Sequence, residues 1–311
     1  MNFRNSMFFL KTLIIVSIAM LYQNALALRF ELKPDQNVYG AIKATTYDNH
    51  DGLFEFSRKY DVAHDVLLAA NPELREEKIP KNTVVMLPLK FILPAAPRKG
   101  IVINLAERRL YIFSKDGKYV DTFPVSIGKE EWDTPLGRHK IVEKRENPVW
   151  YVPKSLYDAQ VAKGVDMPKY VLPGEDNPLG KFAMRLSITS YLIHGTNTPE
   201  RVGRRQTAGC ISLYPEDIKR LFAMSSIGTS VLIVNQPVKM AMQDGQLIVE
   251  SHEPLEESWQ LPSFKEPKSK DEKLLKVVYD RWKRSKNSSD QLLMKVIQQQ
   301  AGIPRVVKTR V

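Results

Sequence analysis

The chain has few of the residues and segments that define several classes of protein. Its 311 residues include a single cysteine, Cys210, so no internal disulfide can form, and five histidines without the spacing of a metal site. After residue 27, no apolar run approaches the roughly 20 residues that a helix needs to cross a bilayer. From these absences we expect no disulfide framework, no bound metal, no cofactor and no transmembrane segment.

The first 27 residues have the composition of a secretory signal. Arg4 and Lys11 precede a short apolar run over residues 12–21, and the segment ends in Ala25, Leu26 and Ala27. A basic start, a short apolar run and a small-x-small ending predict cleavage after Ala27. The mature protein is therefore expected to be soluble in the periplasm.

The positive charge of the mature chain is concentrated at its C-terminal end. Without the signal, 44 Lys and Arg face 35 Asp and Glu, and residues 260–311 alone contain 13 of the former and 5 of the latter. The rest of the chain is nearly neutral, and nucleic acid is not an expected partner. The basic tail is either a solvated surface or a contact for anionic envelope polymers or lipid headgroups.

Cys210 is a candidate nucleophile. A protein sent to an oxidising compartment with one unpaired cysteine retains it where a thiol is needed, although a buried structural cysteine is the alternative. Gly209 and Ile211 flank it, which predicts a turn that opens onto a regular element and lets backbone N–H groups converge. His194 follows the apolar residues 191–193 at the end of a predicted strand, sixteen positions before Cys210.

The segment from His194 to Ser212, HGTNTPERVGRRQTAGCIS, resembles the signature of the L,D-transpeptidase catalytic domain, the YkuD family. That signature is a His followed roughly fifteen residues later by Ser/Thr-His-Gly-Cys. Within the family, the chain is most similar to the periplasmic ErfK/YbiS-type enzymes over most of residues 38–258. Two positions differ, since Ala208 stands where the family has a second His, and Ser212 where it commonly has Arg or Asn.

The resemblance implies an acyl transfer through a cysteine thioester. The donor would be a peptidoglycan tetrapeptide stem that Cys210 attacks at its third residue, with release of D-alanine. The acceptor would be an amine of another stem or of an envelope protein, or water. His194 would be the base, with its ring oriented by the carbonyl of Gly195, and backbone N–H groups of residues 208–210 would receive the oxyanion. Expected substrate contacts are Thr196, Arg204, Arg205, Thr207, Ala208, Gly209 and Ser212.

Two other functions stay open at this point. The replacements at Ala208 and Ser212 also fit a peptidoglycan-binding protein whose catalytic domain has decayed. Hydrolysis of the same linkages is a further alternative. Retention of both His194 and Cys210 in register favours the enzyme.

Residues 38–88 are predicted to form a strand, two helices and a strand, with Asn71-Pro72 as the breaker after the second helix. This βααβ order resembles the LysM domain, which implies binding to the N-acetylhexosamine backbone of peptidoglycan. A structural spacer is the alternative. His50 and His64 are expected at the surface of this module.

Beyond a Pro-rich joint over residues 93–100, residues 97–236 contain many short strands and one helix, at 215–224. This density of strands predicts a mainly β, sandwich-like catalytic domain. The resemblance implies that residues 147–181, with Trp150, Tyr151 and Tyr170, form a lid over the site, whereas ordinary packing is the alternative. His139 is expected to be structural.

Residues 237–258 are predicted to form a C-terminal hairpin extension about Asp244-Gly245, a strong turn dipeptide. The basic tail over residues 260–311 follows, with helices expected at 272–284 and 290–301 and a stop at Gly302.

Overall fold

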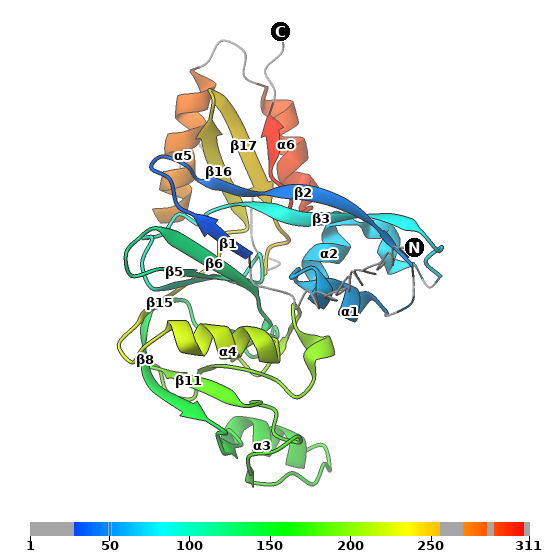
Figure 1. Ribbon diagram of the computed structural model, residues 1–311, viewed down its shortest axis with the longest axis vertical. Helices are drawn as coiled ribbons and strands as arrows, with labels where there is room; N and C mark the ends of the chain where they lie inside the picture. Colours follow the sequence, from blue (N-terminus) through cyan, green and yellow to red (C-terminus); the bar gives the residue numbers. More distant parts are fainter. Residues whose placement is uncertain are drawn as a thin grey trace, which may run out of the picture.

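The computed structural model describes residues 28–48, 50, 52–76, 78–255, 270–284 and 289–307. The predicted signal over residues 1–27 lies outside this range, as do residues 256–269 of the hairpin extension and tail. Three groups of elements follow along the chain: an N-terminal unit, a central sheet and a C-terminal unit (Figure 1).

A single mixed sheet of nine strands forms the centre of the molecule. In spatial order its strands are β1 (Leu28–Glu31), β6 (Tyr119–Pro124), β5 (Arg109–Phe113), β4 (Ile101–Asn104), β15 (Ser230–Val234), β8 (Gly137–Glu146), β11 (Phe182–Leu186), β12 (Leu192–His194) and β14 (Ile211–Ser212). Neighbours are antiparallel except β4 with β15 and β12 with β14. The mainly β prediction is confirmed, and the two layers that a sandwich would have are parts of one sheet that curls on itself.

The curled sheet encloses a core to which distant strands contribute. Ile101 of β4, Phe123 of β6, Ile193 of β12 and Ile211 of β14 all belong to this one hydrophobic cluster. Helix α4 (Pro215–Met224) begins and ends where the sequence predicts, and it adds Ile218 and Leu221 to the cluster. The β12–β14 end of the sheet is thus anchored by buried side chains on both strands.

The N-terminal unit has the predicted order of strand, helix, helix and strand. It consists of β2 (Val38–Tyr47), α1 (Gly52–Lys59), α2 (His64–Ala70), the short 3-10 helix η1 (Pro72–Arg75) and β3 (Thr83–Ile92). The side chain of Asn71 fixes the end of α2, because its amide donates to the carbonyls of Leu67 and Met86 and its oxygen accepts the N–H of Met86. His50 is exposed as expected.

His64 is buried, so its expected surface position is wrong. Its ring stacks on Phe54 at 4.2 Å between centroids, and its Nδ1 lies 3.5 Å from the hydroxyl of Ser57. The cause is the tight approach of the loop around Gly203, whose carbonyl accepts the N–H of Asp65. A Cβ on Gly203 would come within 2.3 Å of the backbone nitrogen of His64. A sequence pattern does not show that this face of α2 is covered by another domain.

The N-terminal unit is docked against the central domain. Arg58 of α1 pairs through two nitrogens with Glu216 of α4, at 2.8 and 2.9 Å, and Arg108 pairs with Asp65 at 3.0 Å. The guanidinium of Arg204 lies 4.4 Å over the ring of Phe54. The part of the β2–β3 ribbon that contains Tyr39 and Phe91 packs on β4 and β5, where its side chains join those of Val102 and Tyr111 in a second hydrophobic cluster.

The C-terminal unit packs two helices on a small sheet (Figure 1). Its elements are β16 (Val238–Gln243), β17 (Gln246–Ser251), α5 (Lys270–Lys283), α6 (Asp290–Gln299) and β18 (Arg305–Val307). The predicted hairpin is confirmed, since Asp244 and Gly245 both have positive φ and join paired strands. Strand β18, which pairs with β17, was not expected from the sequence.

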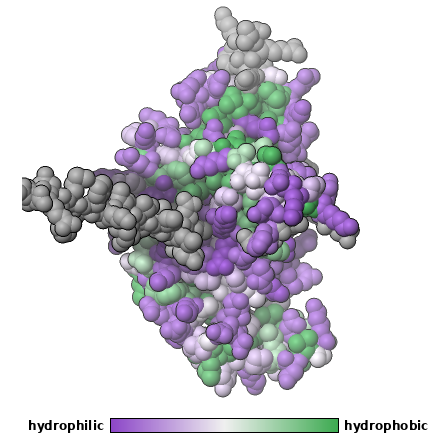
Figure 2. Space-filling view, turned by 45° about the vertical axis from the view of Figure 1, so that its right-hand side comes forward, coloured by the Kyte–Doolittle hydropathy of each residue, from purple (hydrophilic) through white to green (hydrophobic). Residues whose placement is uncertain are grey.

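Hydrophilic side chains cover most of the face in Figure 2, while hydrophobic ones gather mainly in its upper part. None of the helices in the described part of the chain is long and apolar enough to cross a membrane.

Candidate active site

His194 and Cys210 lie on neighbouring strands at one end of the sheet. Strands β12 and β14 run parallel, with Ile193 opposite Ile211 and His194 opposite Ser212. Cys210 stands one step before Ile211, beside Leu192, and residues two apart on a strand face the same side. The thiol and the imidazole therefore share one face of the sheet.

The turn before Cys210 is held by side-chain hydrogen bonds and close packing. The hydroxyl of Thr207 donates to the carbonyl of Cys210 at 2.5 Å, and that of Thr134 donates to the carbonyl of Gly209 at 2.9 Å. The φ of Gly209 is +95°, and a Cβ there would come within 2.7 Å of the ring of Tyr191. The loop that contains Thr134 thus packs beside Cys210.

The turn that leads into Cys210 carries three successive backbone N–H groups. The N–H groups of Ala208, Gly209 and Cys210 donate to no acceptor within the described part of the chain. Successive unpaired N–H groups in a turn form a concavity that attracts negative charge. The turn can therefore stabilise an oxyanion without a side chain at position 208.

His194 is held as a neutral base. Its side chain is buried, and its Nδ1 lies 2.6 Å from the carbonyl oxygen of Gly195. A carbonyl only accepts, so Nδ1 carries the proton and Nε2 keeps its lone pair. Burial lowers the pKa of His194 to about 4, with a smaller opposing effect of the Gly195 bond.

Cys210 is protonated at neutral pH. Burial raises the pKa of its thiol, and the backbone of Leu192 offsets part of this effect. Its Sγ lies 3.7 Å from the carbonyl oxygen of Ser190. The resting site therefore contains a thiol and a neutral imidazole, with no charged pair.

A cavity of about 450 Å³ opens on Cys210. Its floor is formed by Glu143 and Arg145 of β8, Ala183 and Arg185 of β11, and Leu192 of β12. Its roof is formed by residues 148–153, and Leu179 and Ser190 complete the wall. The floor follows from the sheet order, because β8, β11 and β12 are successive neighbours.

The roof belongs to the segment 147–181. It contains β9 (Trp150–Tyr151), β10 (Tyr170–Val171) and α3 (Lys154–Val161), a helix that the sequence did not indicate. Trp150 and Tyr151 line the cavity, whereas Tyr170 does not. Tyr170 pairs with Tyr151 across the two short strands.

Asn177 holds the base of the roof. It is fully buried, its amide donates to the carbonyl oxygens of Pro148, Val171 and Leu172, and its side-chain oxygen accepts the N–H of Leu179. One side chain thus joins both ends of the segment.

Two guanidinium groups and one carboxylate give the floor a net positive charge. Glu143 accepts the Nε–H of Arg185 at 2.7 Å and also that of Arg145. The contacts with Arg185 and Arg145 lower the pKa of Glu143, whereas burial raises it. The arginines outweigh burial and hold this pKa below the usual range. The Nη groups of both arginines have no hydrogen-bond partner among the described residues, so they remain free for a ligand.

The expected substrate contacts lie around the turn and not in the lining of this cavity. Thr207 and Gly209 shape the turn, and Ala208 belongs to it. Thr196 accepts the N–H of Thr198 through its hydroxyl at 3.0 Å. Of the catalytic and substrate-contact residues that the sequence nominated, Cys210 alone is among those lining the cavity.

The remaining expected contacts have partners elsewhere. Arg204 lies over Phe54 of the N-terminal unit, and Arg205 donates to the carbonyl of Leu255 and pairs with Asp133. Ser212 is buried and exchanges backbone hydrogen bonds with Ser126. Arg145 and Arg185 were not among the residues expected from the sequence. Arg185 is the one charged residue of β11, whereas Arg145 stands among several charged residues of β8 and carries no distinct signal.

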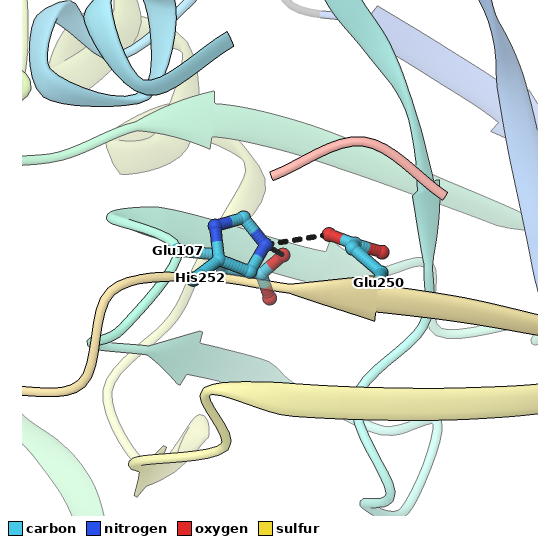
Figure 3. A group of neighbouring side chains, drawn as sticks. All are labelled: Glu107, Glu250 and His252. Carbon is cyan, nitrogen blue, oxygen red and sulfur yellow. Dashed lines mark hydrogen bonds and ion pairs between the residues drawn. The ribbon is translucent and has the colours of Figure 1, made fainter. Parts of the chain in front are cut away.

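One further group has the residue types of a metal centre. Glu107, Glu250 and His252 approach one another in the interior (Figure 3). The ammonium of Lys239 lies 2.5 Å from Glu107 and 3.0 Å from Glu250, so a cation of the chain itself already pairs with both carboxylates. Burial raises the pKa of Glu250, but Lys239 and His252 outweigh it and hold that pKa below the usual range.

Glu250 also accepts the N–H of Ile92 at 2.6 Å, and Lys239 donates to the carbonyl of Ile92. The group therefore joins β3, the loop after β4 and the C-terminal hairpin, and its geometry is that of an internal ion-pair network.

Known proteins share this sequence pattern. A family model described as the L,D-transpeptidase catalytic domain matches residues 98–233. The chain is 39% identical to an Escherichia coli protein described as a probable L,D-transpeptidase YcfS, over 70% of each chain. It is 36% identical to the probable L,D-transpeptidase ErfK/SrfK of the same organism, over 78% of this chain and 80% of the relative. The solved catalytic domain of an E. faecium L,D-transpeptidase aligns at 24% identity with a TM-score of 0.34, over 45% of this chain and 98% of that one.

Proposed function

The chain is an L,D-transpeptidase of the ErfK/YbiS type, and on that premise we propose that Cys210 forms a thioester with a peptidoglycan tetrapeptide stem in the periplasm. The observation that carries the proposal is the shared face of β12 and β14, which presents Cys210 to the cavity beside a neutral His194.

Acylation begins from the neutral pair. The thiol proton of Cys210 passes to Nε2 of His194 while Sγ adds to the carbonyl carbon of the donor's third residue. The N–H groups of residues 208–210 receive the oxyanion. His194 then returns the proton to the amine of D-alanine as the C–N bond breaks, which leaves the thioester.

An amine resolves the thioester. It attacks the carbonyl carbon, loses a proton to His194, and expels the sulfur of Cys210. An amine of a second stem gives a cross-link between third residues, and an amine of an envelope protein gives a covalent anchor to the wall. Water gives net hydrolysis of the donor.

The donor's free carboxylates are held by the cavity floor. The unpaired Nη groups of Arg145 and Arg185 face a site whose one acidic side chain, Glu143, is already shared between them. Guanidinium groups bind carboxylates in a bidentate geometry. The roof residues Trp150 and Tyr151 supply apolar contact area on the other side.

Ala208 does not remove a required group in this mechanism. The base is His194, and the contribution of position 208 is its backbone N–H. A decayed, purely binding protein is the competing account, and it predicts neither thioester nor released D-alanine.

The N-terminal unit adds glycan binding, as its resemblance to LysM implies. Hydrogen exchange of the full protein with and without an N-acetylglucosamine tetramer tests this part. Protection confined to residues 38–88 supports it, whereas no protection there contradicts it.

Product analysis tests the central proposal. Incubation with a disaccharide tetrapeptide should release D-alanine and yield dimers, anchored protein or tripeptide, and the Cys210→Ser variant should yield none of these. Absence of all products from the native protein would favour the binding-protein account.

A further inference from the structure

The amide nitrogen of Leu28 lies beside a buried carboxylate. Leu28 is the first residue of β1, and its nitrogen is 3.3 Å from Oδ2 of Asp61, which is 2% exposed. Asp61 follows α1 in a turn with a φ of +56°. Strand β1 pairs with β6, and Leu28 lies opposite Thr122. The start of β1 is thereby fixed between the N-terminal unit and the central sheet.

Asp61 has a second buried acid as its neighbour. Asp217 of α4 is 1% exposed, and its Oδ1 has no hydrogen-bond partner within the described residues. Burial raises the pKa of Asp61 to about 7, and burial together with Asp61 raises that of Asp217 well above its usual range. Neither of these buried carboxyl groups forms an ion pair with a side chain among the described residues.

Three arginines act on this pair, but none forms an ion pair with either carboxyl group among the described residues. Arg220 of α4 lies 3.5 Å from Asp121 and leaves its Nη1 without a hydrogen-bond partner there, and Arg58 of α1 forms the bidentate pair with Glu216. Arg109 of β5 donates to the hydroxyl of Thr122. Arg109 and Arg220 lower the pKa of Asp61, but they do not outweigh burial, and Glu216 acts against them.

Cleavage after Ala27 would change the chemistry at this position. Hydrolysis by an envelope signal peptidase adds water across the Ala27–Leu28 bond, so that Ala27 gains a carboxylate and Leu28 an ammonium. A single N–H donor then becomes a positive charge with three N–H donors. The opposite charge would lie within hydrogen-bond reach of Asp61, close enough to favour its ionised form.

We propose that Asp61 binds the α-ammonium group of the processed chain, and that removal of residues 1–27 completes a buried ion pair. This pair fixes β1 in the sheet and ties it to the turn after α1 of the N-terminal unit. The mature fold is thus stabilised by the processing event itself. The inference depends on the predicted cleavage position and not on the proposed catalytic function.

The test compares three forms of the protein. The first begins at Leu28 with a free amine, the second is the same chain with an Nα-acetyl group, and the third retains Ala27 before Leu28. NMR titration of the folded protein gives the pKa of the Leu28 amine and of the Asp61 carboxyl. In the first form we expect the amine pKa to lie about 1–3 units above its ordinary value, and the Asp61 pKa to lie lower than in the other two forms by a similar amount.

Thermal unfolding supplies the matched controls. The form with the free Leu28 amine should melt several degrees above the acetylated form, on the order of 4 °C or more. Asp61→Asn should abolish this difference, and Asp35→Asn, at an exposed position with a positive φ, should preserve it.

An ordinary amine pKa together with an unchanged Asp61 pKa would overturn the inference, as would a melting difference that persists in Asp61→Asn. Because the titration needs no mutation, it decides the matter even if Asp61→Asn does not fold. None of these measurements uses a peptidoglycan donor, so their failure is distinct from failure of the proposed activity.

Discussion

The Nδ1 atom of His194 lies 2.6 Å from the carbonyl oxygen of Gly195, the next residue along the chain. This contact fixes the tautomer of the ring with a main-chain group, in a role that other cysteine enzymes give to a side chain. A Cβ on Gly195 would come within 3.0 Å of Ile218, so the backbone here also packs tightly against α4.

His194→Ala should lower the rate of acylation by roughly 10² to 10⁴-fold, because general-base help is typically of that size. Ala208→His should change the rate by about tenfold or less, since the proposed mechanism already uses His194 as the base. Acylation rates of the native protein and both variants on one tetrapeptide donor make the comparison. If the native protein were inactive and the Ala208→His variant were active, the assignment of His194 as the base would be contradicted.

The pH dependence of acylation should reflect the low pKa of His194, about 4. The neutral ring is the base, so the rate falls only as the pH drops through that value, and not through the 6.5 of an unperturbed imidazole. Single-turnover acylation rates measured between about pH 3.5 and pH 8 should therefore not change between about pH 6 and pH 7. A midpoint near 6.5 would contradict the neutral resting pair.

Arg185→Gln should raise KM for a tetrapeptide donor more than it lowers kcat, because the guanidinium holds a carboxylate distant from the reacting carbonyl. The native protein should prefer a donor with free carboxylates over one whose carboxylates are amidated, and Arg185→Gln should not distinguish the two donors. Arg138→Gln is the matched control, since Arg138 is an exposed residue of β8 outside the cavity lining. Equal effects of the two substitutions would remove Arg185 from the binding site.

Asn177→Ala should loosen the roof of the cavity. The substitution leaves the buried carbonyl of Pro148 and the half-buried carbonyl of Val171 without this donor, at a cost of about 1–3 kcal/mol. Hydrogen exchange should accelerate over residues 148–179, while strands β16 and β17 stay unchanged as an internal control. Uniform acceleration throughout the protein would indicate a general loss of stability instead.

A carbapenem has a strained β-lactam carbonyl that an activated thiol attacks, so it should add one drug mass to the native protein if Cys210 is the nucleophile. Intact-mass spectra of the native protein and of Cys210→Ser make the comparison. Equal labelling of the two proteins would mean that the drug reacts elsewhere.

The sequence predicted the features that local chemistry determines. Pro215 with two acidic residues begins α4, and Asp244-Gly245 turns the hairpin, because each signal acts within a few residues. His194 and Cys210 were identifiable as candidates from their residue types and spacing, and the structure brings them to the same end of the sheet.

Features that depend on distant pairing were not predictable. Arg145 and Arg185 meet at Glu143 only because β8 pairs with β11, and His64 is buried only because a loop 139 positions further along the chain covers it. The short strands β1 and β18 likewise form because they complete sheets that start elsewhere in the chain. Long-range sheet order is the information that a pattern of residues along one chain lacks.

The most direct measurement is the intact mass of the protein during turnover of a disaccharide tetrapeptide donor. The account predicts a transient adduct equal to the donor minus D-alanine, carried on the peptide that contains Cys210, absent from Cys210→Ser and slow to form in His194→Ala. Release of D-alanine with no adduct on Cys210, or an adduct of the same mass on the Cys210→Ser variant, would contradict it.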